Sequence, residues 1–179
     1  MNFDDDIKIV GDKPSDTVRQ NRIRADKNVE YTAKDMAHAK RLGQLIAEKY
    51  IDEVSGSAYS EESFEVLSQI KLLLSFTATV GFERFCKNDT LSGLAQKSFI
   101  DTLSKKDEAL YKASSDMGAF SFYYLAFRRS GDIERRMGQT FAMLCSRDGD
   151  PIFQERGEAL YCWFSSVIRK NACELSLDR

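Results

Sequence analysis

The stretch from residue 64 to residue 86, FEVLSQIKLLLSFTATVGFERFC, decides the fold expected for this chain. Its apolar residues surround the axis of an α-helix instead of lining one face. A helix that is apolar on every side must be covered on every side by other parts of the protein. Ser75, Glu83 and Arg84 interrupt the run, which falls short of the roughly 20 apolar residues that a membrane span needs. We therefore expect a buried central helix and no membrane partner.

A second stretch with the same pattern runs from Met117 to Phe127, where aromatic and aliphatic residues again surround the helix axis. It predicts a second central helix, covered on every side like the first. Other segments have apolar residues at the period of an α-helix along one face, which predicts helices that cover the central pair. These segments span residues 32–54, 91–103, 133–145 and 151–175.

Helix starts are marked by side chains that accept hydrogen bonds from the first free backbone amides. Thr32 and Asp35 have the spacing of a capping box, and Asp150 followed by Pro151 is typical of a helix start. The helix that contains the decisive stretch is expected to begin near Ser60. The short loops between these helices favour antiparallel packing of neighbours.

The predicted fold is all-α, a single-domain bundle of about six helices with two central buried helices. The bundle is expected to span residues 31–179, and residues 1–30 are expected to form a polar, partly flexible N-terminal arm. Gly81, Gly118 and Gly138 lie inside predicted helices, where glycine costs about 1 kcal/mol relative to alanine. We therefore expect close helix crossings at these three glycines.

Composition and motifs argue against several classes of function. The 179 residues carry a formal net charge of -2, with 42% hydrophobic and 30% charged residues, as is usual for a globular protein. His38 is the only histidine and no two of the four cysteines form a C-x-x-C pair, so the sequence predicts no metal site. It has no phosphate-binding loop and no nucleophile with a suitable base, so we predict no catalytic residue and no cofactor. This pattern favours a non-enzymatic protein without deciding the question.

Arg156 lies within the apolar stripe of the last predicted helix, between the directions of Ile152 and Trp163. A charge on such a stripe must pair with an opposite charge, bind an anion or extend outward to solvent. We favour pairing with a carboxylate from a neighbouring helix. In the alternative, Arg156 anchors an anionic or aromatic ligand between helices, with Trp163, Tyr123 and Tyr124 lining the pocket. Simple packing also explains aromatic side chains on a buried helix.

A group of basic residues flanks the turn at residues 130–132 and forms a candidate basic surface. Its members are Arg128, Arg129, Arg135 and Arg136. Such a surface can meet phosphate groups, and basic residues of the N-terminal arm can add to it. Asp132 and Glu134 are interleaved with the arginines, however, which favours a solvated surface with local charge pairing. The near-neutral net charge gives no support to nucleic acid as the main partner.

These observations lead to one functional hypothesis and two alternatives. Two helices apolar on every side, together with an amphipathic last helix, present more apolar surface than one small bundle can cover, so we expect self-association. The acidic residues at positions 4–6 differ from the basic start of a secretory signal peptide, which predicts a cytoplasmic location. The hypothesis is a non-enzymatic cytosolic interaction or regulatory protein that forms a homodimer, or binds another protein. The alternatives are a small-molecule-binding protein or enzyme with an interhelical pocket, and a nucleic-acid-binding protein that uses the basic arm.

Overall fold

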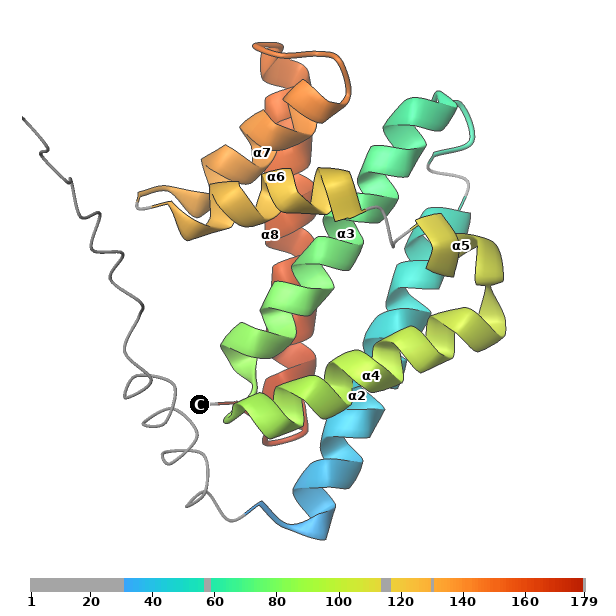
Figure 1. Ribbon diagram of the computed structural model, residues 1–179, viewed down its shortest axis with the longest axis vertical. Helices are drawn as coiled ribbons and strands as arrows, with labels where there is room; N and C mark the ends of the chain where they lie inside the picture. The colour runs from blue at the N-terminus through green and yellow to red at the C-terminus, as the bar shows by residue number, and fades with distance from the viewer. Residues whose placement is uncertain (1–30, 57–58, 114–116, 130, 179) are drawn as a thin grey trace, which may run out of the picture. The chain divides into compact units, whose positions relative to one another are not determined.

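The computed structural model describes residues 31–56, 59–113, 117–129 and 131–178, and the predicted arm over residues 1–30 lies outside them. Within these ranges the chain forms helices and no strand, as the all-α prediction requires (Figure 1). The helices are α2 (Ala33–Ser55), α3 (Phe64–Phe85), α4 (Asp89–Lys106), α5 (Glu108–Ala113), α6 (Met117–Arg128), α7 (Ile133–Leu144) and α8 (Pro151–Glu174). None of these helices combines the length and the apolar character that crossing a bilayer requires.

Helix α3 is the buried centre of the bundle, as its sequence predicts. It packs against each of the other helices that the structure describes. Every residue from Leu72 to Ala78 is buried, so both the aliphatic and the hydroxyl-bearing faces of these two turns are covered. The hydroxyl of Thr77 donates to the carbonyl oxygen of Leu73 at 2.7 Å, which satisfies the polar group inside its own helix.

Three helix pairs cross closely at glycines. Where α2 crosses α4, a Cβ at Gly43 would meet the carbonyl oxygen of Ala95. Where α7 crosses α8, a Cβ at Gly138 would meet the carbonyl oxygen of Gln154. A Cβ at Gly81 would lie 2.8 Å from Cδ1 of Ile168, where α3 crosses α8. The expected crossings at Gly81 and Gly138 are therefore confirmed.

Gly118, the third glycine expected at a crossing, is exposed near the start of α6. Gly43, where α2 crosses α4, is not among the three glycines expected at a crossing. Small residues at a crossing and small residues on an apolar face have the same periodicity, so the sequence does not separate them.

The helix starts follow their capping residues. Thr32 and Asp35 form the predicted capping box of α2, and the side chain of Asp150 accepts from the first amides of α8. Helix α3, in contrast, begins at Phe64 and not near Ser60. The hydroxyl of Ser63 accepts from the amide of Val66 at 3.3 Å, and residues 59–62 form a turn before the helix.

Helix α6 departs from the expectation of a second central helix covered on every side. It packs mainly against α7 and α3, so only one of its faces meets the core. Tyr123 and Ala126 on that side are buried, whereas the side chains of Phe122 and Leu125 are 50% and 59% exposed. The prediction of two central buried helices is right for α3 and wrong for the outward face of α6.

Candidate functional site

The outward face of α6 is the first part of the candidate site. Phe122 and Leu125 are three residues apart, which places them on one side of α6, and Arg129 follows directly after Arg128, the last residue of the helix. All three are exposed, and we call them the α6 face. On a neighbouring side, the guanidinium of Arg128 lies 5.4 Å from the ring centroid of the exposed Tyr124, a cation–π contact. Large apolar side chains in an exposed row are typical of surfaces that contact another molecule.

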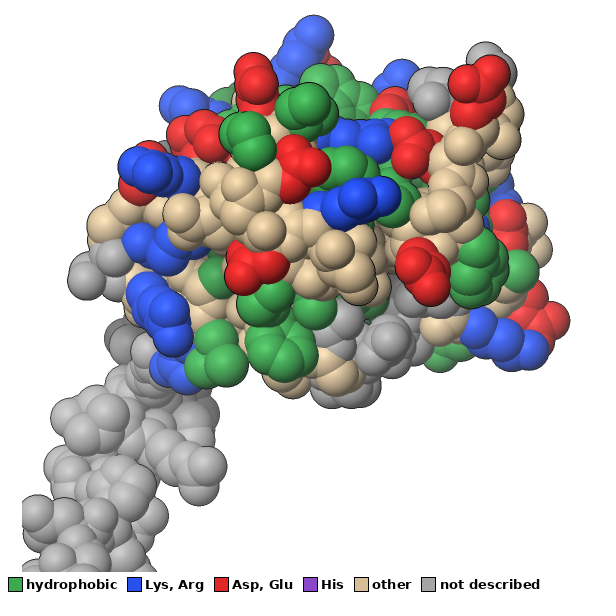
Figure 2. Space-filling model, turned by 90° about the horizontal axis from the view of Figure 1, so that it is seen from above, with side chains coloured by type: hydrophobic (Ala, Val, Ile, Leu, Met, Phe, Trp, Pro, Cys, Tyr) green, Lys and Arg blue, Asp and Glu red, His purple; other side chains and the backbone are tan. Residues whose placement is uncertain are grey.

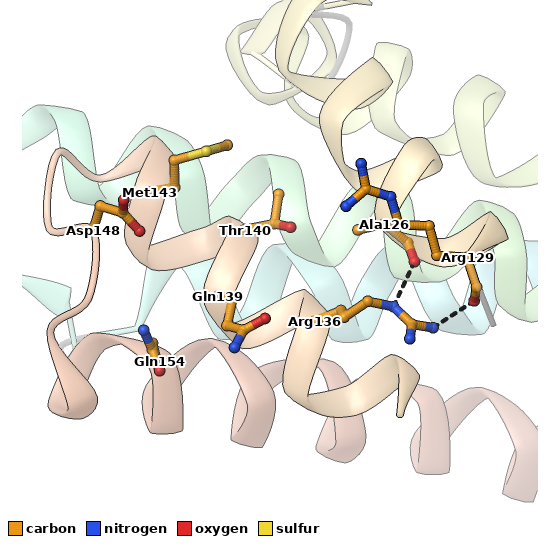
Figure 3. A pocket seen from close by; sticks show the side chains of 8 residues that line it. All are labelled: Ala126, Arg129, Arg136, Gln139, Thr140, Met143, Asp148 and Gln154. Carbon is orange, nitrogen blue, oxygen red and sulfur yellow. Dashed lines mark hydrogen bonds between the residues drawn. The ribbon is translucent and has the colours of Figure 1, made fainter. Parts of the chain in front are cut away.

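A hollow of about 290 Å³ adjoins the α6 face, and we call it the α6–α7 hollow (Figure 3). Ala126 of helix α6 and Arg129, directly after the end of this helix, contribute to its lining. Figure 3 shows Arg129 and Arg136 at one end of the hollow and Met143 and Asp148 at the other. The hollow is at the lower limit of the volumes that usually hold small ligands.

The positions of the remaining lining residues follow from the fold. Arg136, Gln139, Thr140 and Met143 are spaced by three, four and seven residues, so one face of α7 supplies all four. The bare backbone of Gly138 lets α8 approach α7, and this close crossing brings Gln154 to the edge of the hollow.

Asp148 lies in the turn between α7 and α8. This turn is fixed by Ser146, whose φ of 57° is in the left-handed region, and by a hydrogen bond from the amide of Arg147 to the carbonyl oxygen of Ala142 at 2.8 Å. Both features belong to a Schellman motif, which closes the C-terminal end of a helix. The backbone therefore holds Asp148 beside the hollow.

Arg136 has a structural task at the junction of α6 and α7. Its Nε donates to the carbonyl oxygen of Ala126 at 2.9 Å, and its Nη2 donates to those of Arg129 at 2.6 Å and Gly131 at 3.3 Å. These carbonyls include free acceptors at the negative end of the α6 dipole. Within the predicted basic surface, Arg136 thus fixes the end of α6, while Arg128, Arg129 and Arg135 are exposed.

The α6 face and the hollow carry charges of both signs. The ion pairs within the described ranges join Lys106 to Glu48, Lys112 to Glu108, Arg156 to Glu62, and Lys170 to Glu174. Neither Arg129 nor Asp148 belongs to them, and both side chains are exposed. Seen from the end of the bundle that carries the α7–α8 turn, hydrophobic side chains are exposed between acidic and basic ones (Figure 2).

Arg156 pairs with a carboxylate, as predicted, but the partner precedes α3 instead of lying on a helix. Its Nη2 lies 2.7 Å from Oε1 of Glu62, and both side chains are half-buried. The guanidinium also lies 5.8 Å from the ring centroid of Tyr59, whose hydroxyl donates to Glu53. Since Glu62 neutralises it, Arg156 needs no anionic ligand.

The four residues proposed to line an interhelical pocket do not form one group. Tyr123 is fully buried and stacks on Phe76 with ring centroids 5.6 Å apart, and its hydroxyl has no partner among the residues that the structure describes. This burial raises the pKa of Tyr123 well above its usual value. Trp163 stacks on Phe164 near the surface, and Tyr124 is exposed beside Arg128. The structure therefore places Tyr123 in the core and both Tyr124 and Trp163 at the surface.

Sequence reasoning missed Phe122, Leu125 and Asp148 as surface residues of interest. A signal was present, because Arg129 continues the line of Phe122 and Leu125, and an unpaired arginine does not belong in a core. No cluster of three metal-ligating side chains occurs in residues 31–178, so far as they are described. Comparison of the chain with protein families, with curated proteins and with solved structures finds no significant match.

Proposed function

We propose that this chain is a non-enzymatic cytosolic interaction protein that forms a homodimer, with the α6 face in the contact. The observation that carries the proposal is the exposure of Phe122 and Leu125, which are 50% and 59% exposed on a helix whose opposite side is in the core. Within the described residues, the neighbouring helices leave Phe122 and Leu125 uncovered. A second copy that covers it would remove a contiguous apolar surface from water.

Burial of Phe122 and Leu125 alone gives a contact of limited strength. Complete burial of a Phe or Leu side chain is worth about 1.5–3 kcal/mol, so the exposed halves of Phe122 and Leu125 contribute about 1 kcal/mol each. A twofold interface uses each residue twice, which gives about 4 kcal/mol. This gain in free energy only equals the lowest estimates of the free-energy cost of association, about 4 kcal/mol. A stable dimer therefore needs further contacts beside the α6 face.

The test is the oligomeric state of the full chain and of two matched variants. We expect the mass from sedimentation velocity or light scattering to rise from monomer to dimer with concentration. Leu125→Glu should keep the chain monomeric, because two carboxylates would enter the apolar contact. Ile152→Glu is the control, since Ile152 is 74% exposed at the start of α8 and does not line the hollow.

Circular dichroism should show both variants to be as helical as the original chain, because both positions are exposed on helices. A chain that is monomeric at every accessible concentration would refute the homodimer. Loss of the dimer in Ile152→Glu but not in Leu125→Glu would move the contact away from α6.

A further inference from the structure

We infer that the two ends of the α6–α7 hollow bind each other across a homodimer, with Arg129 of each copy paired with Asp148 of the second copy. The inference rests on the proposed homodimer and states how its two chains are oriented. It starts from Arg129 and Asp148, which lie at opposite ends of the hollow (Figure 3). Both are exposed, and within the described parts of the chain neither takes part in an ion pair.

The two sides of the hollow are complementary in both polarity and charge. On the α6 side, the apolar Leu125 of the α6 face comes four residues before the cationic Arg129, and of these two Arg129 lines the hollow. On the opposite side, the exposed Met143 near the end of α7 is followed by the anionic Asp148 of the α7–α8 turn. Each side thus offers an apolar side chain and an exposed charge of opposite sign, Arg129 or Asp148, while the guanidinium of Arg136 beside Arg129 donates to backbone carbonyls.

This complementarity allows two copies to face each other across the hollow when a twofold axis relates them. Rotation by half a turn exchanges the two sides, so the α6 side of each copy faces the α7-end side of the other. Leu125 then packs against Met143 of the second copy, and Arg129 meets Asp148 of the second copy. Both contacts occur twice, which adds to the contribution of Phe122 and Leu125.

The residues between the two sides suit a contact with protein surface better than a small ligand. Gln139, Thr140 and Gln154 line the hollow with amide and hydroxyl groups that can both donate and accept hydrogen bonds. Such groups form the polar surroundings of an apolar contact in protein interfaces. The small volume of about 290 Å³ also favours shallow side-chain insertion over enclosure of a ligand.

The experiment reverses one charge at a time and then mixes the two variants. In homodimers of Arg129→Glu, the introduced glutamate faces Asp148 of the second copy, and in homodimers of Asp148→Arg, the introduced arginine faces Arg129. Both homodimers then contain two repulsive pairs, and we expect each dissociation constant to rise at least about tenfold. Arg135→Glu is the matched control, because this exposed arginine does not line the hollow and its reversal should leave the dissociation constant unchanged.

An equimolar mixture of Arg129→Glu and Asp148→Arg should form a heterodimer with nearly the affinity of the original homodimer. In that heterodimer the two introduced charges attract each other, and the second pair is the native one. Native mass spectrometry separates the heterodimer from both homodimers when one chain carries a tag. The affinity of the original dimer should also fall with added salt, because the charge pairs are partly exposed.

The outcomes separate the two proposals. If the original chain dimerises but the single reversals leave the dissociation constant unchanged, the inferred orientation is wrong while the homodimer stands. The same conclusion follows if the equimolar mixture does not form the heterodimer. If Arg135→Glu weakens the dimer as much as Arg129→Glu does, a general charge effect replaces the specific pair. If the original chain is monomeric throughout, the homodimer and the orientation fail together.

Discussion

Replacing Gly43 with alanine tests the closest helix crossing in the bundle. Gly43 is buried where α2 crosses α4. Besides meeting the carbonyl oxygen of Ala95, an added Cβ would lie 2.8 Å from the backbone nitrogen of Phe99 and 2.9 Å from Cβ of Ser98. Most of these obstacles are backbone atoms, which a change of rotamer does not remove. Helix α4 must therefore move away from α2.

The expected loss of stability is the difference between two opposing effects. Overpacking a close-packed core costs about 1–3 kcal/mol, and obstruction by backbone atoms places Gly43→Ala at the upper end of that range. Alanine inside a helix gains about 1 kcal/mol over glycine. The free energy of unfolding should therefore fall by about 2 kcal/mol. For a domain of this size, such a loss lowers the melting temperature by about 4–8 °C.

Gly93→Ala provides the control on α4 itself. Gly93 is exposed, and a Cβ there would have no other heavy atom within 4 Å. The helix propensity then acts alone, and the variant should gain up to about 1 kcal/mol. Chemical denaturation followed by far-ultraviolet circular dichroism measures both changes. Equal or greater stability of Gly43→Ala, with Gly93→Ala behaving as expected, would refute the close approach of α2 to α4.

Two further predictions concern the ion pair of Arg156 and the buried thiol of Cys145. Arg156→Met and Glu62→Gln should each lower the free energy of unfolding by about 1 kcal/mol, because each removes one partner of a half-buried pair. A double-mutant cycle should show coupling between them, and strictly additive effects would contradict the pairing. Burial raises the pKa of Cys145 from 9.0 to about 11, so between these values the unfolded chain loses the proton first and stability falls as pH rises. Across this pH range, the denaturant midpoint should fall less steeply with pH in Cys145→Ala than in the original chain. Equal slopes would show that deprotonation of this thiol does not cause the loss of stability.

The local sequence pattern was sufficient to predict the buried run of α3 and two of the helix starts, because these features depend on interactions between residues close in sequence. The run from Leu72 to Ala78 has no charged residue, and every one of its residues is buried. The capping box at Thr32 and the start of α8 at Asp150 each depend on side chains within three residues of the helix end. Such contacts are already determined by sequence spacing. The pairing of Arg156 was predictable for a similar reason, since a charge on an apolar stripe requires a partner.

The start of α3 was not predictable, because distant residues decide it. Ser60 and Ser63 are both suitable helix caps in the sequence. The turn before Ser63 is held by the hydrogen bond from Tyr59 to Glu53 at the end of α2 and by the ion pair of Glu62 with Arg156 on α8. Both partners of the turn lie on other helices, and a local pattern does not reveal them.

Helices α3 and α6 have the same apolar pattern but different surroundings, because a pattern shows which residues avoid water and not what covers them. Helix α3 meets every other described helix, whereas α6 meets mainly α7 and α3 and leaves Phe122 and Leu125 exposed. Arg129 follows them directly after the end of α6, and a buried arginine without a carboxylate would cost more than its hydrophobic neighbours gain. This row therefore cannot be covered by a purely apolar surface. Whatever covers it must bring an acceptor for the arginine, and in the homodimer that we propose this acceptor is Asp148 of the second copy.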